Sequence, residues 1–129
     1  MAEPIVFISR WRIRRGKRAA LEAMFAQAVE FIGSTKPRTA LFAAYLDEAG
    51  EELRFVHAVP DAAALIDHLE GSEGRSASIQ DMIELVGYEV YGDAPEAAVD
   101  QLRRATGAVP GAELARLPVS MGGYLRAPV

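Results

Sequence analysis

Hydrophobic and polar positions follow two different periods along this chain of 129 residues. Some short stretches are rich in β-branched and aromatic residues, which is typical of strands. Elsewhere apolar residues recur every three or four positions, which is the spacing of one helical face. The two periods predict strands over 4–13, 39–47, 52–59 and 86–91, helices over 17–33, 61–70, 78–85 and 94–106, and a final strand or arm over 113–124.

Residues with strong positional preferences mark the ends of these helices. Gly33 is expected to end the first helix, since glycine is common just past a helix C-terminus. Asp61, Ser78 and Asp93 are expected to cap the next three helices, because short polar side chains accept hydrogen bonds from free N–H groups there. The segment 71–76, rich in glycine and serine, is predicted to be a flexible loop and a candidate lid.

This order of elements predicts an α+β domain of the ferredoxin-like βαββαβ type. Residues 1–92 would form its core, and 93–129 would add a helix and a strand to the same domain. The crossovers of such a unit place both helices on one face of the sheet. The predicted strands nevertheless carry apolar residues on both faces, so both faces should be covered. We expect a homodimer packed sheet against sheet; the alternative is a C-terminal arm folded back over that face.

Composition narrows the possible partners and sites. The formal net charge of −4 argues against nucleic acid as the main partner. The absence of cysteine excludes disulfides, a thiolate nucleophile and any cysteine-based metal site. The apolar runs are short of the roughly 20 residues that a membrane span needs. The first apolar stretch is followed by arginines rather than by a signal-peptide cleavage site, so we expect a cytoplasmic protein.

Three segments within residues 4–92 resemble those of a known family: IVFISRWRI, RAALEAMFAQAVEFI and LRFVHAVPDAAALIDHL. They are similar to the dimeric α/β-barrel superfamily and, within it, to antibiotic biosynthesis monooxygenase-like domains. That family includes cofactor-free oxygenases of phenolic polyketides, quinol oxygenases and haem-degrading enzymes, and it typically has a histidine in the second helix, where this chain has His68. The haem-degrading branch typically relies on an Asn, Trp and His set, and the absence of Asn argues against it.

The resemblance implies a monooxygenase that acts on a small aromatic or quinol-like substrate without a cofactor. The alternative is a non-catalytic module of the same fold, which binds a small molecule or only assembles into dimers. The missing Asn and the C-terminal extension favour this alternative. An enclosed pocket containing a histidine would favour the enzyme, whereas a core filled by Phe7, Phe25 and Phe55 would favour the module.

The two histidines are the candidate catalytic residues. His57 lies in the middle of a predicted strand, and its imidazole could deprotonate an acidic phenol because its reference pKa is about 6.5. The structural alternative for His57 is a hydrogen bond to a neighbouring strand or to Tyr45. His68 lies at the edge of a helical apolar stripe, where it could enter a pocket or remain half-exposed. Two histidines without a third ligand are a weak metal signal, so we expect no metal.

Aromatic residues and one arginine are the candidate substrate-binding residues. Trp11 and Tyr45 could line an aromatic pocket, although Trp11 could equally anchor a dimer interface. Arg10 belongs to an arginine-rich cluster that could orient a substrate, or that is simply a solvated strand end. Tyr88 and Tyr91 fall on opposite faces of one predicted strand, so one of them can face the pocket, and Tyr88 is our candidate.

Overall fold

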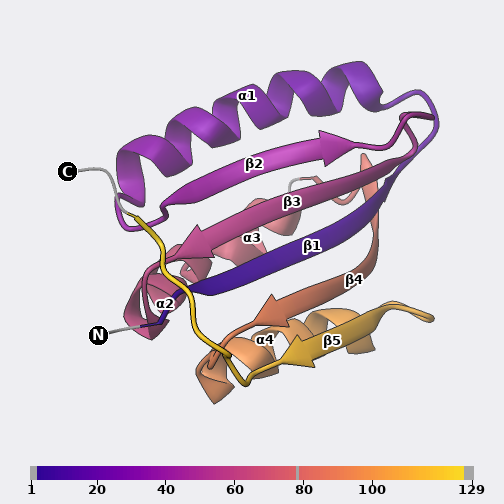
Figure 1. The fold of residues 1–129 in the computed structure, drawn as a ribbon. Helices are drawn as coiled ribbons and strands as arrows, with labels where there is room; N and C mark the ends of the chain where they lie inside the picture. The colour runs from indigo at the N-terminus through magenta and orange to yellow at the C-terminus, as the bar shows by residue number, and fades with distance from the viewer. Residues whose placement is uncertain (1–2, 78, 127–129) are drawn as a thin grey trace.

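The computed structural model describes residues 3–77 and 79–126 (Figure 1). Its elements, in chain order, are β1 (Ile5–Ile13), α1 (Arg18–Thr35), β2 (Leu41–Leu46), β3 (Glu52–Val59), α2 (Ala62–Leu69), α3 (Ser72–Ala77), β4 (Ile83–Tyr91), α4 (Glu96–Gly107) and β5 (Glu113–Leu117). The prediction of a ferredoxin-like α+β fold with an added helix and strand is confirmed. No helix in these residues is long and apolar enough to cross a membrane.

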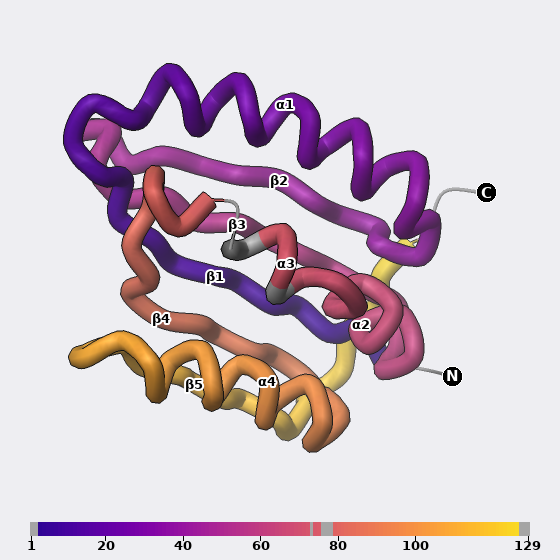
Figure 2. The backbone as a smooth tube through the Cα atoms, turned by 180° about the vertical axis from the view of Figure 1, so that it is seen from behind, coloured from indigo at the N-terminus to yellow at the C-terminus, as the bar shows by residue number. Residues whose placement is uncertain are grey.

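The five strands form one sheet in the order β2-β3-β1-β4-β5. The first four strands pair antiparallel, whereas β5 pairs parallel to β4 after the crossover through α4. The helices lie on one face of this sheet, with α1 along the β2 edge, α4 along the β5 edge, and α2 and α3 between them (Figure 2). The hydrophobic core fills the space between that face and the helices, and none of the helices in the described residues covers the other face.

Alternation along β1 shows how the strands contribute to this core. Odd-numbered residues of β1, including Ile5, Phe7 and Trp11, are buried on the helix side, while Val6 and Ile8 are half-buried on the open side. The largest side chains with less than 2% exposure are Leu65, Ile83, Val59, Val90 and Val99. They come from α2, β3, β4 and α4, so the added helix α4 packs into the same core as the rest of the chain.

An irregularity in β4 changes which of its residues face the helices. Arg10 pairs with Gly87, but the next residue of β1, Trp11, pairs with Leu85, so β4 carries one extra residue at Val86. Such a bulge shifts the alternation by one position. Leu85 and Tyr88 are three residues apart and would face opposite sides of a regular strand, yet both are buried on the helix side here.

Glycine is required where β5 joins the sheet. A Cβ atom on Gly87 would lie 2.4 Å from the backbone oxygen of Glu113, its partner in β5. Real side chains do not tolerate so short a distance to backbone, so any other residue would push β5 away from β4. The bulge at Val86 and the glycine at position 87 are therefore neighbours with different effects. The bulge turns Tyr88 towards the helices, and Gly87 allows β5 to pair closely with β4.

Several predicted boundaries are wrong. The expected helix over 78–85 does not form: Ile83 begins β4, because its backbone pairs with β1 and tertiary pairing overrides local periodicity. The segment 71–76, predicted to be a loop and lid, instead contains most of α3, and Arg75 there donates hydrogen bonds to carbonyls at the end of α2. Ser78 lies outside the described residues.

The predicted helix caps have different outcomes. Asp61 caps α2 as predicted, since its carboxylate accepts a hydrogen bond of 2.9 Å from the N–H of Ala64. Asp93 does not cap α4, because that helix begins only at Glu96 and Pro95 occupies the cap position. Proline fixes the extended backbone that leads into the helix, so the start lies two residues later than the aspartate suggested.

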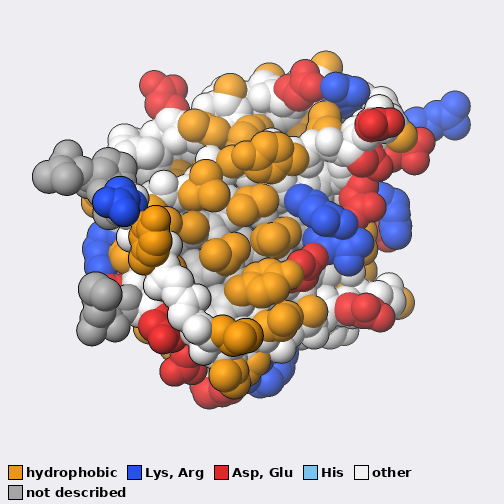
Figure 3. Space-filling model, in the orientation of Figure 1, with side chains coloured by type: hydrophobic (Ala, Val, Ile, Leu, Met, Phe, Trp, Pro, Cys, Tyr) orange, Lys and Arg blue, Asp and Glu red, His pale blue; other side chains and the backbone are white. Residues whose placement is uncertain are grey.

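The open face of the sheet carries an exposed patch of apolar side chains (Figure 3). Leu41 and Tyr45 of β2 are 41% and 62% exposed, respectively. After β5 the chain crosses one end of this face (Figure 1), where Val119 and Met121 remain exposed rather than packed. The C-terminal arm therefore leaves the apolar centre of the open face uncovered.

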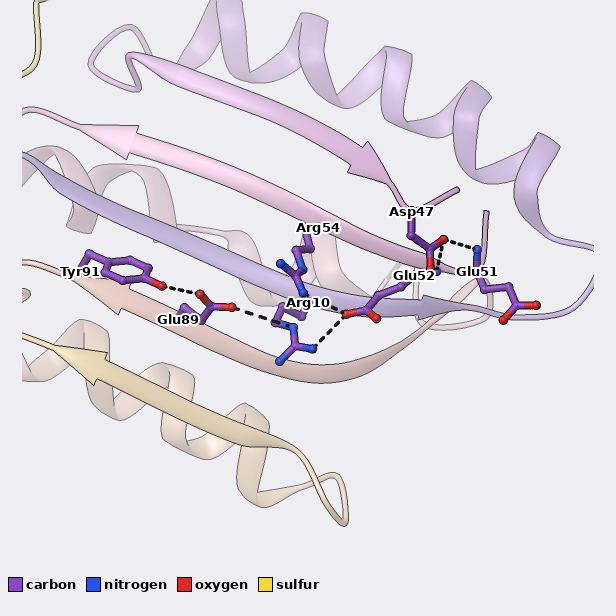
Figure 4. A network of polar contacts seen from close by, with 7 residues as sticks. All are labelled: Arg10, Asp47, Glu51, Glu52, Arg54, Glu89 and Tyr91. Atoms are coloured by element: carbon purple, nitrogen blue, oxygen red, sulfur yellow. Dashed lines mark hydrogen bonds and ion pairs between the residues drawn. The ribbon is translucent and has the colours of Figure 1, made fainter. Parts of the chain in front are cut away.

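A charged network lies beside this apolar patch on the open face (Figure 4). Arg10 forms an ion pair of 3.0 Å with Glu52 and a longer one of 3.9 Å with Glu89. Arg54 lies 3.6 Å from the Glu52 carboxylate, and the Tyr91 hydroxyl donates a hydrogen bond to Glu89. The side chains of Arg10 and Glu52 are about one-third exposed, at 33% and 34%, so this network is partly shielded from water.

Candidate functional site

A cavity of about 360 Å³ lies between the helix face of the sheet and helices α1, α2 and α3. Its volume is in the range of small-molecule pockets. Most of the lining is aromatic or aliphatic: Phe7, Trp11, Met24, Phe25, Phe31, Ile32, Phe42, Phe55, Leu69, Ile79 and Tyr88. Among these side chains are both histidines of the protein, His57 and His68. The cavity is therefore a mostly apolar pocket with two imidazoles in its wall.

His57 is fixed in one orientation and one tautomer. Its ring stacks on Phe7 with the ring centroids 4.3 Å apart, and it is only 6% exposed. Its Nδ1 lies 3.0 Å from the backbone oxygen of Phe7. A carbonyl can only accept, so Nδ1 carries the proton and Nε2 keeps a free lone pair. This is the hydrogen bond to a neighbouring strand that the structural alternative predicted, and it leaves the other nitrogen available.

His68 is held at the end of α2 and is buried rather than half-exposed, with 3% exposure. Its Nδ1 lies 2.8 Å from the hydroxyl of Thr39. Cations also bind the last carbonyls of α2: Lys36 donates to Asp67 and Arg75 donates to His68, each at 2.7 Å. These bonds hold the last turn of α2, and with it the imidazole, against the pocket.

Burial keeps both imidazoles neutral. Loss of hydration lowers the pKa of His57 to about 3, and the neighbouring His68 lowers it further in the same direction. Burial likewise lowers the pKa of His68 to about 4, with the positive charges of Arg75 and Lys36 contributing. The two rings contact each other edge to face, with centroids 4.8 Å apart. Both histidines are therefore unprotonated and only weakly basic in the empty pocket, and a bound anion beside them would raise their pKa values towards the range of a useful base.

Trp11 and Tyr88 form another part of the wall. The Trp11 indole donates a hydrogen bond of 2.8 Å to the hydroxyl of Ser9, which fixes the ring. The rings of Trp11 and Tyr88 meet edge to face, with centroids 6.5 Å apart. Burial raises the pKa of Tyr88 to about 12, so its hydroxyl stays protonated and can donate a hydrogen bond.

Four of the six predicted site residues come together in this pocket, and two do not. His57, His68, Trp11 and Tyr88 all line it. Arg10 and Tyr45 do not: Arg10 alternates with Trp11 and belongs to the charged network, and Tyr45 is exposed on β2. Strand alternation directs both side chains to the open face, so Tyr45 does not line this pocket and Arg10 does not reach a ligand bound in it.

Sequence reasoning missed other residues of the pocket. Phe42 packs against both histidines, with ring centroids 5.3 Å from His57 and 6.0 Å from His68. Its alternation with Leu41 was visible in the sequence, but the face on which it lies depends on the sheet order. Arg75 also lines the pocket, from a helix that was predicted to be a loop. In the described part of the chain, no group of three or more His, Cys, Asp or Glu side chains could hold a metal.

Comparison with known proteins gives structural matches only. No protein-family model matches the sequence, and no curated protein matches it. The crystal structure of MupZ from Pseudomonas fluorescens is 17% identical, with a TM-score of 0.67, and the match covers 94% of this chain and 95% of MupZ.

Two further structures cover less of this chain. SnoaB from Streptomyces nogalater, a cofactor-independent oxygenase, is 14% identical with a TM-score of 0.59, over 73% of this chain and 96% of SnoaB. A candidate antibiotic biosynthesis monooxygenase from Chloroflexus aurantiacus is 15% identical with a TM-score of 0.56, over 72% of this chain and 93% of that one. The chain thus has the fold of antibiotic biosynthesis monooxygenase-like proteins, and the fold shared with MupZ includes more of the chain than the fold shared with SnoaB.

Proposed function

We propose that this protein is a cofactor-independent monooxygenase of a small aromatic or quinol-like substrate. The observation that carries the proposal is a neutral His57, with its Nε2 unpaired among the described residues, in the wall of a cavity lined mostly by aromatic side chains. Such a wall excludes water and stacks on a planar substrate, while a neutral imidazole takes its proton. The similarity in fold to SnoaB supports the same class of reaction.

The proposed chemistry begins with proton transfer from the substrate to His57 or His68. The resulting phenolate or carbanion is an electron-rich species that dioxygen can oxidise. For a methylene group activated by adjacent phenol rings, one oxygen atom enters the substrate as a carbonyl. The two hydrogen atoms leave with the other oxygen as water, so the substrate supplies all four electrons. Tyr88 lies in the same wall, and in this proposal its hydroxyl donates a hydrogen bond to the developing negative charge.

Oxygen uptake with a panel of anthrones and naphthoquinols tests this activity. We expect uptake with at least one of them, and a loss of about 100-fold or more in kcat when His57 is replaced by Asn. The Asn amide can still donate to the Phe7 carbonyl, so H57N removes Nε2 while keeping the structural hydrogen bond. The matched control is His57→Gln, whose longer amide places a polar group nearer the position of Nε2 and gives up the donor to Phe7.

The same design applies to His68. His68→Asn keeps a polar atom near Thr39 and removes the rest of the ring. Unchanged turnover in both H57N and H68N, with a substrate that the native protein oxidises, would remove the histidines from the mechanism. Binding of the panel without any oxygen uptake would instead support the alternative, a non-catalytic small-molecule-binding module of the same fold.

The proposal includes a homodimer formed by the open faces of two sheets. The apolar patch of this face is uncovered, and a stable interface of this type buries roughly 1,200–2,000 Å². Ile8 and Val56 are paired neighbours within it. Ile8→Glu should place like charges against each other in the dimer and yield a folded monomer. Analytical ultracentrifugation checks this, with Ala63→Glu, an exposed position on α2, as the control. A native protein that sediments as a monomer at micromolar concentration would rule the dimer out.

A further inference from the structure

A second cavity, of about 670 Å³, lies beside the first and extends between β4 and α4. Three residues line both cavities: Trp11, Ser72 and Tyr88. At this shared boundary the Gln101 side chain of α4 donates a hydrogen bond of 2.7 Å to the Ser72 hydroxyl of α3. The two cavities are therefore neighbours with a common wall, and the helix of the C-terminal extension forms the far side of the second.

The linings of the two cavities differ in chemistry. The first is aromatic and contains neutral histidines, whereas the second combines apolar side chains with the amides of Gln80 and Gln101 and with charges of both signs, including Arg14 and Glu84. Arg14 is fixed by a hydrogen bond of 3.0 Å from its Nε to the backbone oxygen of Gln80. Such a wall presents donors and acceptors together. It suits an uncharged chain with hydroxyl groups, because each hydroxyl both donates and accepts, rather than a single ion.

We propose that the second cavity binds the polar tail of the substrate whose apolar aromatic head occupies the first. The tail is an uncharged, hydroxylated chain, and the substrate is an elongated molecule with two chemically different halves. This inference rests on the proposed function, because it takes the first cavity as the site of the reacting group. It assigns a binding role to the extension, since Gln101 and Ala105 of α4 belong to the second wall.

Three naphthalene probes test the inference: 2-naphthol, 2-hexyloxynaphthalene and the 2-naphthyl ether of sorbitol. The last two carry tails of equal carbon number, one apolar and one hydroxylated. Trp11 is the only tryptophan and lines both cavities, so its fluorescence reports the binding of each probe. We expect the sorbitol ether to bind about tenfold more tightly than 2-naphthol, through several added hydrogen bonds, and more tightly than the hexyl ether.

Two variants separate the cavities. Ala105→Phe fills the second cavity and should reduce the affinity of the sorbitol ether to that of 2-naphthol, leaving 2-naphthol binding within about twofold. The matched control is Ala97→Phe, the same change at an exposed position of α4. Gln101→Leu keeps approximate size, removes the amide and should weaken the sorbitol ether alone. It gives an independent result if A105F does not fold.

The outcomes distinguish this inference from the proposed function. If 2-naphthol binds but the sorbitol ether gains nothing, or its gain survives in both A105F and Q101L, the second cavity does not hold the tail and the first remains a ligand site. If no probe binds, both proposals are contradicted. A gain for the sorbitol ether that disappears in A105F and Q101L and persists in Ala97→Phe supports the two-part site.

Discussion

The two faces of the sheet are made by the same strands but provide opposite environments. On the helix face, Val59 is 1% exposed and His57 is buried among aromatic rings. On the open face, Tyr45 is 62% exposed and Arg10 takes part in a network of ion pairs. Because adjacent residues of a strand point to opposite sides, each environment begins one residue away from the other. One face can therefore hold a mostly apolar pocket while the other remains available for assembly.

The comparison shows where a charge is tolerated. On the open face the arginines and glutamates are paired at distances of 3.0–3.9 Å and keep contact with water. On the helix face the two histidines gain little from partners and respond to burial by staying uncharged. Burial of an ionised group without a counter-charge is unfavourable, so the neutral form of each histidine has the lower free energy. The pH dependence of the free energy of unfolding should therefore come much more from the groups on the helix face than from those on the open face.

The largest expected effect is a loss of stability in acid. An unfolded histidine titrates near pH 6.5, whereas folded His57 and His68 have pKa values of about 3 and 4. Between these values the unfolded chain binds more protons than the folded one, so the free energy of unfolding falls as the pH falls. The stability that the two histidines contribute should be fully present above pH 6.5 and decrease by roughly 5 kcal/mol by about pH 4.5, since each loses about 1.4 kcal/mol per pH unit. Urea denaturation at a series of pH values measures this.

A double variant controls for other titrating groups. Replacing both histidines by Asn should flatten the dependence between about pH 6.5 and 4.5. The buried histidines would be the wrong explanation if the native protein kept its stability across that range, or if the double variant lost it equally. Asp61, whose pKa is lowered by the Arg38 side chain, contributes only at lower pH.

A smaller effect is expected when the same substitution is made on each face of one strand, β3. Val59→Ala removes two methyl groups from the helix face and should lower the free energy of unfolding by about 2 kcal/mol, because it leaves a cavity in the core. Val56→Ala makes the same change on the open face, where the side chain is only half-buried, and should have less than half that effect at low protein concentration. Equal losses in the two variants, measured by urea denaturation, would mean that the faces are not packed differently.

The sequence was sufficient to predict the alternating strands and the order of the elements, since these depend on local periodicity. Alternation over residues 52–59 puts His57 on the same side of its strand as Phe55, and both line the pocket. It could not place Tyr88 with certainty, because the bulge at Val86 shifts the alternation and depends on the pairing of β4 with β1. Tyr45 shows a similar limit. The face on which it lies depends on the register in which β2 pairs with β3, and hydrophobic periodicity along the chain does not give that register.

The error at residues 78–85 has a related cause. Ile79, Met82 and Ile83 have helical spacing, but Ile83 and Leu85 also alternate as in a strand, and the hydrogen bonds available from β1 decide between the two. The helix α3 was missed for the opposite reason. Its residues have weak helical propensity, and its hydrogen bonds from Arg75 to α2 exist only in the folded chain.

The smallest expected effect tests whether the open face stays open. In an isolated chain Glu52→Gln removes the negative charge that pairs with both Arg10 and Arg54, at a site that still contacts water. The loss in unfolding free energy should therefore be below about 1 kcal/mol and decrease with added salt. In the proposed dimer a second sheet covers the same arginines, and a buried charge without its partner destabilises far more. The effect of E52Q should therefore grow with protein concentration, whereas Glu48→Gln in the exposed β2–β3 turn should stay near zero throughout. Thermal unfolding over a hundredfold range of concentration measures the difference, and an E52Q effect that does not vary over that range would argue that the face is solvated in the assembled protein too.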